Sequence, residues 1–121
     1  MDDAASEGSP ALRPGSRLRL SGGYWEPIWI NGDSGDLGTL ERFIPGQNTE
    51  PAAVVRLDAP LTVKDVTGAI VVLELRYVGQ VWSNKGTVHV ELCDFDPGSV
   101  RWQDRRQGKW VESHASYEVE K

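Results

Sequence analysis

The feature that most constrains this chain is a two-residue alternation of apolar and polar side chains, which recurs in short segments. In residues 69–78, the side chains of Val71, Leu73, Leu75 and Tyr77 fall on one face, because successive side chains of a strand point to opposite sides. The chain also contains 13 glycines and 7 prolines, which punctuate these segments and would interrupt a helix. No segment shows the 3.6-residue period of an amphipathic helix. The pattern therefore predicts an all-β chain.

Each strand can be placed by its alternation and by the turn residues that flank it. We expect strands at residues 16–20, 38–44, 52–58, 69–78 and 87–93, with a short closing strand at 110–112. Residues 38–44 and 52–58 should form one hairpin, and residues 69–78 and 87–93 a second. We interpret Pro60 to Gly68 as a connector. The segment 69–78 is apolar on both faces in its first half, which is typical of a central strand.

The size and charge of the chain exclude several classes of protein. Its 121 residues fit one domain, which we expect at 12–121 after a disordered leader at 1–11. The net charge of −5 argues against binding bulk nucleic acid, which requires cations to neutralise phosphates. No apolar run is long enough to span a bilayer, and no signal-peptide pattern is present. With a lone Cys93, the expected location is the cytoplasm.

Aromatic side chains gather in the expected loops. The segment 21–36 should be a long loop rich in glycine and aromatic residues, and clustered loop aromatics form adhesive surfaces. We predict that a protein or peptide partner binds to Tyr24, Trp25 and Trp29 of this loop, together with Trp82 and Trp102 in or next to other expected loops or strand ends. The alternative is that two or three of these rings cap the open ends of a barrel.

Residues 89–93 contain a cysteine nucleophile and a histidine base close together in sequence. Four residues of strand separate His89 from Cys93 by about 13 Å, too far for a catalytic dyad. His89, Glu91 and Cys93 share one face about 6.6 Å apart and could share a metal. We favour the alternative, a solvated polar face with no metal and no cofactor.

Other candidate chemistry is weaker. Glu112, Ser113 and His114 contain the residue types of a triad, but a triad is defined by geometry. Asp94 and Asp96 hold only part of a calcium-loop pattern, so we interpret them as an acidic turn. We find no phosphate-binding or hydrolase motif. We expect no independent enzymatic activity.

The order of segments resembles a known family. LRPGSRLRL, GDLGTLERF, AAVVRLD, LRYVGQVW and GTVHVELCDFDP, within residues 12 to 97, resemble in order the small barrel that ends the β subunit of nitrile hydratase. The resemblance implies a small antiparallel barrel like that of Src-homology-3 domains, with an accessory, partner-contacting role. It does not imply catalysis, because that enzyme holds its metal on a Cys-rich loop of its other subunit, and no such cluster is present here.

These patterns together favour a non-enzymatic interaction module that binds a protein or peptide through loop aromatics. The first alternative is an accessory subunit or assembly factor of a nitrile-hydratase-like metalloenzyme. The second is single-stranded RNA binding by the tail, where Arg101, Arg105, Arg106 and Lys109 interleave with two Trp. Acidic residues in the same tail make an ordinary salt-bridged surface the preferred interpretation. No pattern points to a particular oligomeric state.

Overall fold

The computed structural model describes residues 12–22, 36–46, 51–75, 81–98 and 108–120, which form six β-strands and no helix. The strands are β1 (Arg17–Ser21), β2 (Asp36–Pro45), β3 (Pro51–Val63), β4 (Val66–Glu74), β5 (Lys85–Cys93) and β6 (Trp110–Val119). The all-β fold predicted from the alternation is confirmed.

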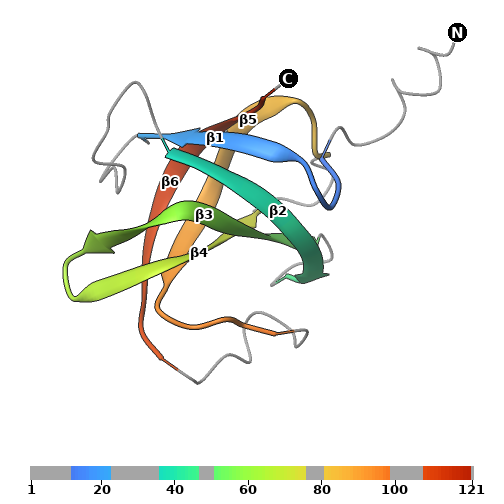
Figure 1. Cartoon of the computed structure of the whole chain (residues 1–121). Helices are drawn as coiled ribbons and strands as arrows, with labels where there is room; N and C mark the ends of the chain where they lie inside the picture. The colour runs from blue at the N-terminus through green and yellow to red at the C-terminus, as the bar shows by residue number, and fades with distance from the viewer. Residues whose placement is uncertain (1–11, 23–35, 47–50, 76–80, 99–107, 121) are drawn as a thin grey trace, which may run out of the picture.

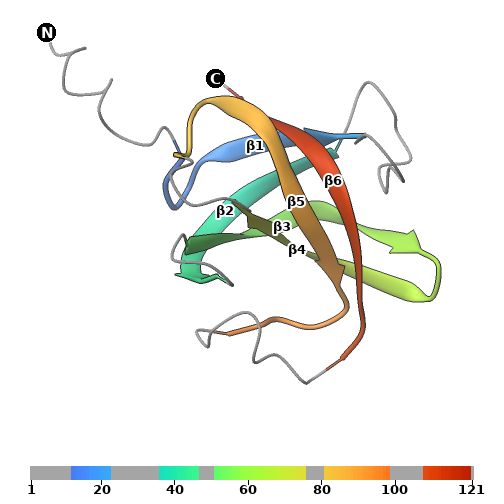
Figure 2. The same ribbon diagram turned by 180° about the vertical axis from the view of Figure 1, so that it is seen from behind.

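Each strand pairs antiparallel with the next, and β6 pairs with β1 to close a barrel (Figures 1 and 2). Both expected hairpins are present, as β2 with β3 and β4 with β5. Closure removes the open edges at which strands of separate chains can pair. This small six-stranded barrel is consistent with a Src-homology-3-like fold.

The barrel interior is filled by apolar side chains at alternate positions of every strand. Val88, Val90 and Leu92 of β5 point inward as the alternation predicts, opposite Leu73 and Val71 of β4. The fully buried members of this core include Leu18, Leu20, Leu40, Ala53, Val55, Val71, Leu73, Val90, Leu92 and Ala115. A filled interior of this kind is a packed core and leaves function to the outer wall and the loops.

The outer wall carries a second, smaller apolar cluster over β2 to β5. We call it the outer cluster, and it consists of Ile44, Ala52, Val54, Ile70, Val72 and Cys93. Because of this cluster, β3 and β4 are buried on both faces along part of their length. The prediction of a central strand at residues 69–78 is therefore confirmed for its described part.

The strand boundaries differ from those that the sequence predicted mainly in two regions. Pro60 to Gly68 is not a connector: β3 continues to Val63 and β4 begins at Val66, so the two form one long hairpin. Pro60 sits in the stretch where the pairing register shifts, between Arg56 and Leu61, which is where a strand tolerates a residue without an N–H. The closing strand also extends well beyond residue 112, because alternation continues through Ala115 and Tyr117.

The turn of the β3–β4 hairpin is strained. Lys64 and Asp65 connect the paired residues Val63 and Val66, and Lys64 has a φ of 57°. A left-handed backbone costs a side-chain-bearing residue about 1 kcal/mol or more, and glycine is favoured at this position of a two-residue hairpin turn.

We therefore expect Lys64→Gly to raise the free energy of unfolding by about 0.5–1 kcal/mol, because glycine relieves the left-handed strain. The measurement is urea unfolding followed by tryptophan fluorescence. Lys64→Ala is the matched control, since it removes the same side chain but keeps the strain, and it should give no gain. An equal gain in both variants would show that the lysine side chain, not the backbone, is unfavourable.

Candidate metal centre on the outer wall

Three ionisable side chains are buried together on the outer wall of the barrel. Glu74 ends β4, and His89 and Glu91 lie two residues apart on β5. Their exposed fractions are 3%, 3% and 1%. The predicted solvated face at His89, Glu91 and Cys93 is thus wrong: the side chains do face outward, but the outer wall is covered at this point.

Strand pairing brings the three side chains together. Glu74 of β4 is the Cα partner of His89 of β5, and directly paired residues hold their Cβ atoms about 5 Å apart on the same face. Glu91 falls on that face because it follows His89 by two residues. The face is the outer one, since Val90 between them points into the core.

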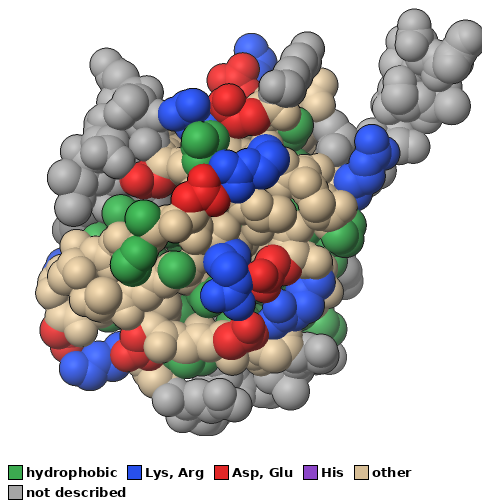
Figure 3. Space-filling view, in the orientation of Figure 1, with side chains coloured by type: hydrophobic (Ala, Val, Ile, Leu, Met, Phe, Trp, Pro, Cys, Tyr) green, Lys and Arg blue, Asp and Glu red, His purple; other side chains and the backbone are tan. Residues whose placement is uncertain are grey.

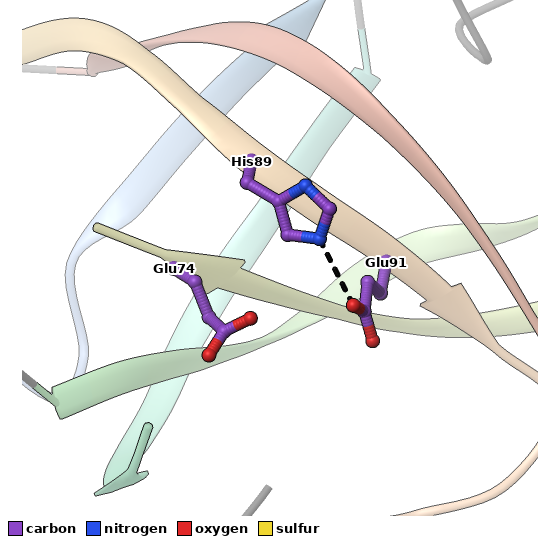
Figure 4. A group of neighbouring side chains, drawn as sticks. All are labelled: Glu74, His89 and Glu91. Carbon is purple, nitrogen blue, oxygen red and sulfur yellow. Dashed lines mark hydrogen bonds and ion pairs between the residues drawn. The ribbon is translucent and has the colours of Figure 1, made fainter. Parts of the chain in front are cut away.

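The ligand atoms of the group converge on His89. Its Nε2 lies 2.9 Å from Oε2 of Glu91, a distance at which an Nε2–H donates a hydrogen bond to a carboxylate. One oxygen of each glutamate and one nitrogen of His89 all lie within 4.8 Å of one another. Figure 4 shows the three side chains projecting into a common space from β4 and β5.

Two residues of β6 adjoin the group. Oε1 of Glu112 lies 3.5 Å from Nε2 of His89, and the Glu112 side chain is 60% exposed. The ring of His114 meets the ring of His89 edge to face, with 5.7 Å between their centroids. Two imidazoles and three carboxylates therefore occupy neighbouring positions of β4, β5 and β6.

Apolar side chains surround the carboxylates of the group, which raises the free-energy cost of their ionisation. Ala52 is paired with Glu74, and Val72 is paired with Glu91, so apolar residues of the outer cluster flank both carboxylates. Burial of an ionised carboxylate is costly unless a cation or hydrogen bonds compensate it, and charges interact more strongly where water is excluded. A divalent cation held by Glu74, His89 and Glu91 would supply such compensation for both carboxylates.

Cys93 does not join this group. Its thiol is fully buried and donates to the backbone oxygen of Glu91 at 3.6 Å, and Cys93 is not one of the three residues whose ligand atoms lie within 4.8 Å of one another. The candidate ligands in the structure are therefore Glu74, His89 and Glu91. The sequence had suggested His89, Glu91 and Cys93. Glu74 follows the inward-facing Leu73 and so faces outward from its strand, but only the β4–β5 register reveals that it lies opposite His89.

The aromatic residues proposed to bind a partner lie mostly outside the described residues, namely Tyr24, Trp25, Trp29 and Trp102. Trp82 is described and is only 5% exposed. Its ring packs against Tyr117 and Phe43, with centroid distances of 5.8 and 6.1 Å, at the end of the barrel where β5 begins. This is the capping alternative, and it leaves little of the Trp82 ring for a partner. The partner-binding hypothesis for the other four stays a prediction.

Charged side chains on the described surface are largely arranged in pairs. Arg17 contacts Asp58 at 2.6 Å, and this hydrogen bond lowers the pKa of Asp58 below its ordinary value. Lys109 from the basic tail contacts Asp65 at 3.1 Å. Figure 3 shows Lys and Arg side chains next to Asp and Glu across one face of the molecule. Such a face is mixed in sign and is not a basic patch. Arg101, Arg105 and Arg106 lie outside the described residues.

The segment with Asp94 and Asp96 is an acidic turn, as the sequence predicted. Asp96 accepts hydrogen bonds from the backbone N–H of Gly98 at 2.8 Å and from Arg42 at 2.6 Å. The Gly98 hydrogen bond and the Arg42 guanidinium lower the pKa of Asp96. Asp94 accepts from the backbone N–H of Lys109 at 2.9 Å. Both carboxylates are thus used to hold the turn.

Comparisons of the chain with protein-family models, curated proteins and solved structures found no match. The described residues include no helix long and apolar enough to cross a membrane. The candidate site therefore rests on the geometry of this chain alone.

We expect His89→Ala to destabilise the metal-free protein by about 3–5 kcal/mol, because it leaves the buried Glu91 carboxylate without its 2.9 Å partner. Chemical unfolding in the presence of a chelator measures this. Glu112→Ala is the comparison, and loss of its exposed carboxylate should change the free energy of unfolding by less than about 1 kcal/mol in either direction. Similar small losses in both variants would mean that the His89–Glu91 contact is not important to the fold.

Proposed function

We propose that this protein is a metal-binding β-barrel module, which holds one divalent transition-metal ion on Glu74, His89 and Glu91. The observation that carries the proposal is the convergence of three buried ligand atoms within 4.8 Å on the outer wall. Buried ionisable groups are rare unless they are paired or bind a metal.

The distances suit such an ion. Zinc lies about 2.0–2.2 Å from nitrogen and oxygen ligands, so two ligands of one ion are separated by about 2.9–3.5 Å, depending on the geometry. The Nε2 atom of His89 is 2.9 Å from Glu91 and so needs little movement to share an ion with it. Glu74 would have to rotate its carboxylate toward them.

The donor set narrows the choice of metal. One imidazole with two carboxylates suits Zn²⁺, Mn²⁺ or Fe²⁺, whereas Ca²⁺ requires six to eight oxygen ligands and Cu⁺ prefers thiolates or thioethers. The buried site is also more favourable for a strongly bound ion than for Mg²⁺, which gives up its water reluctantly. Zinc is the most direct test ion, because it has no redox chemistry.

The proposal is for binding and not for free-standing catalysis. It is compatible with an accessory subunit or assembly factor of a metalloenzyme, the role that the resemblance to the nitrile hydratase β subunit implies, because such a protein can bind metal without turning over a substrate. A protein partner bound through the loop aromatics would also be compatible with it. Both roles remain proposals.

We expect Zn²⁺, Mn²⁺ or Fe²⁺ to bind the chelator-treated protein with one ion per chain. An ion at 100 times its Kd stabilises the fold by about 2.7 kcal/mol and should raise the Tm by about 10 °C. Isothermal titration calorimetry and thermal unfolding measure the two effects.

The variants Glu91→Gln and His89→Gln should reduce the affinity at least tenfold, because each removes a strong ligand of similar shape. Glu118→Gln is the matched control, since it removes the same charge from β6 at an exposed position opposite Lys85, and it should bind like the original chain. Absence of both heat and a Tm shift with all three metals would contradict the proposal.

A further inference from the structure

We infer that Glu112 of β6 is a fourth ligand of this metal ion, and that the ion thereby fixes the first half of β6 to β5. The inference rests on the proposed function and extends it from a binding site to a metal-dependent clamp on the barrel wall.

The position of the Glu112 carboxylate carries the first step. Its Oε1 lies 3.5 Å from Nε2 of His89, and Oε2 of Glu91 lies 2.9 Å from the same nitrogen. The His89 nitrogen therefore lies within 3.5 Å of one carboxylate oxygen from β5 and one from β6. Both distances match the separation of about 2.9–3.5 Å between two ligands of one zinc ion.

Cross-strand pairing supplies the second step. On β5 and β6, Glu91 is directly opposite Glu112, and His89 is directly opposite His114. Directly opposed like charges destabilise an antiparallel pair. A cation between the two carboxylates reverses the sign of that interaction. Two glutamates are thus directly opposed in the metal-free protein at the point where the metal-bound protein would have a shared ligand set.

The topology supplies the third step. The pairing of β6 with β1 covers Ser116 to Val119, whereas the pairing with β5 runs from Trp110 to Glu118. Within the described residues, the ladder that holds the half of β6 containing Glu112 is therefore the one to β5. Figure 2 shows β5 and β6 running side by side along this half. An ion that binds ligands from both strands acts on that ladder.

The exposed fractions of the ligands indicate the side from which an ion would enter and leave the site. Glu74, His89 and Glu91 are almost completely buried, while Glu112 is 60% exposed. An ion would enter past Glu112 and be held from that side once Glu112 coordinates it. Loss of the ion would return Glu112 to solvent and leave it facing Glu91. The first half of β6 should then open more often.

The test is backbone amide hydrogen exchange of the full chain, followed by NMR with and without Zn²⁺, together with calorimetric zinc affinity. We expect zinc to slow exchange of the amides of residues 110–115 at least tenfold. The amides of 116–119, which β1 also holds, should change less. In Glu112→Gln and Glu112→Ala, zinc should bind at least tenfold more weakly and should not protect residues 110–115. Glu118→Gln, on the same strand and outside the cluster, should behave like the original chain.

Three outcomes separate the two proposals. If zinc binds the Glu112 variants as tightly as the original chain and protects residues 110–115 equally, Glu112 is not a ligand and the clamp is overturned, while the metal site stands. If zinc binds but leaves the exchange of residues 110–115 unchanged in the original chain, the clamp is likewise overturned. If the original chain binds no metal, the proposed function and the clamp both fail.

Discussion

The pairing of β1 with β6 is the constraint on which the rest of this structure depends. It closes the ladder of six strands, and it places Leu20 of β1 opposite Tyr117 of β6 so that both contribute to one interior core. Without this contact, the first and last strands would be open edges, which are sites of aggregation. With it, the interior is filled, and a ligand has only the wall, the ends and the loops of the barrel to bind to.

The wall is unusual in that β3, β4 and β5 bury side chains on both faces. A small barrel has little core, and the outer cluster adds apolar burial to it beyond the interior. Glu74, His89 and Glu91 lie at the edge of the outer cluster and are buried together with it. Burial of ionised carboxylates weakens a fold unless a charge or hydrogen bonds compensate it. A metal ion bound between them would be one such compensation.

A metal ion on this wall would also explain why Glu91 faces Glu112 across β5 and β6. Glutamate opposite glutamate is a poor pair for stability alone. The pair becomes reasonable where carboxylates from two strands bind one ion. Functional sites commonly contain residues that lower the stability of the ligand-free protein, and ligand binding restores that stability.

The sequence by itself determined the strands and which of their residues point inward, because alternation follows from the local geometry of an extended chain. Val71, Leu73 and Leu75 share one face of the predicted strand at 69–78 and lie in one core for that reason. Alternation was also present in Leu61 to Val66, but Pro60 and Gly68 obscured it, and the hairpin there was missed.

Only the tertiary structure decided the register between strands, the closure of the barrel and the burial of its outer wall. Those depend on contacts between residues far apart in sequence, such as Glu74 with His89 and His89 with Glu112. Polar residues at every second position are typical of a solvated face when a strand is considered alone. The same residues become a candidate metal centre when neighbouring strands align them and apolar side chains exclude water from around them.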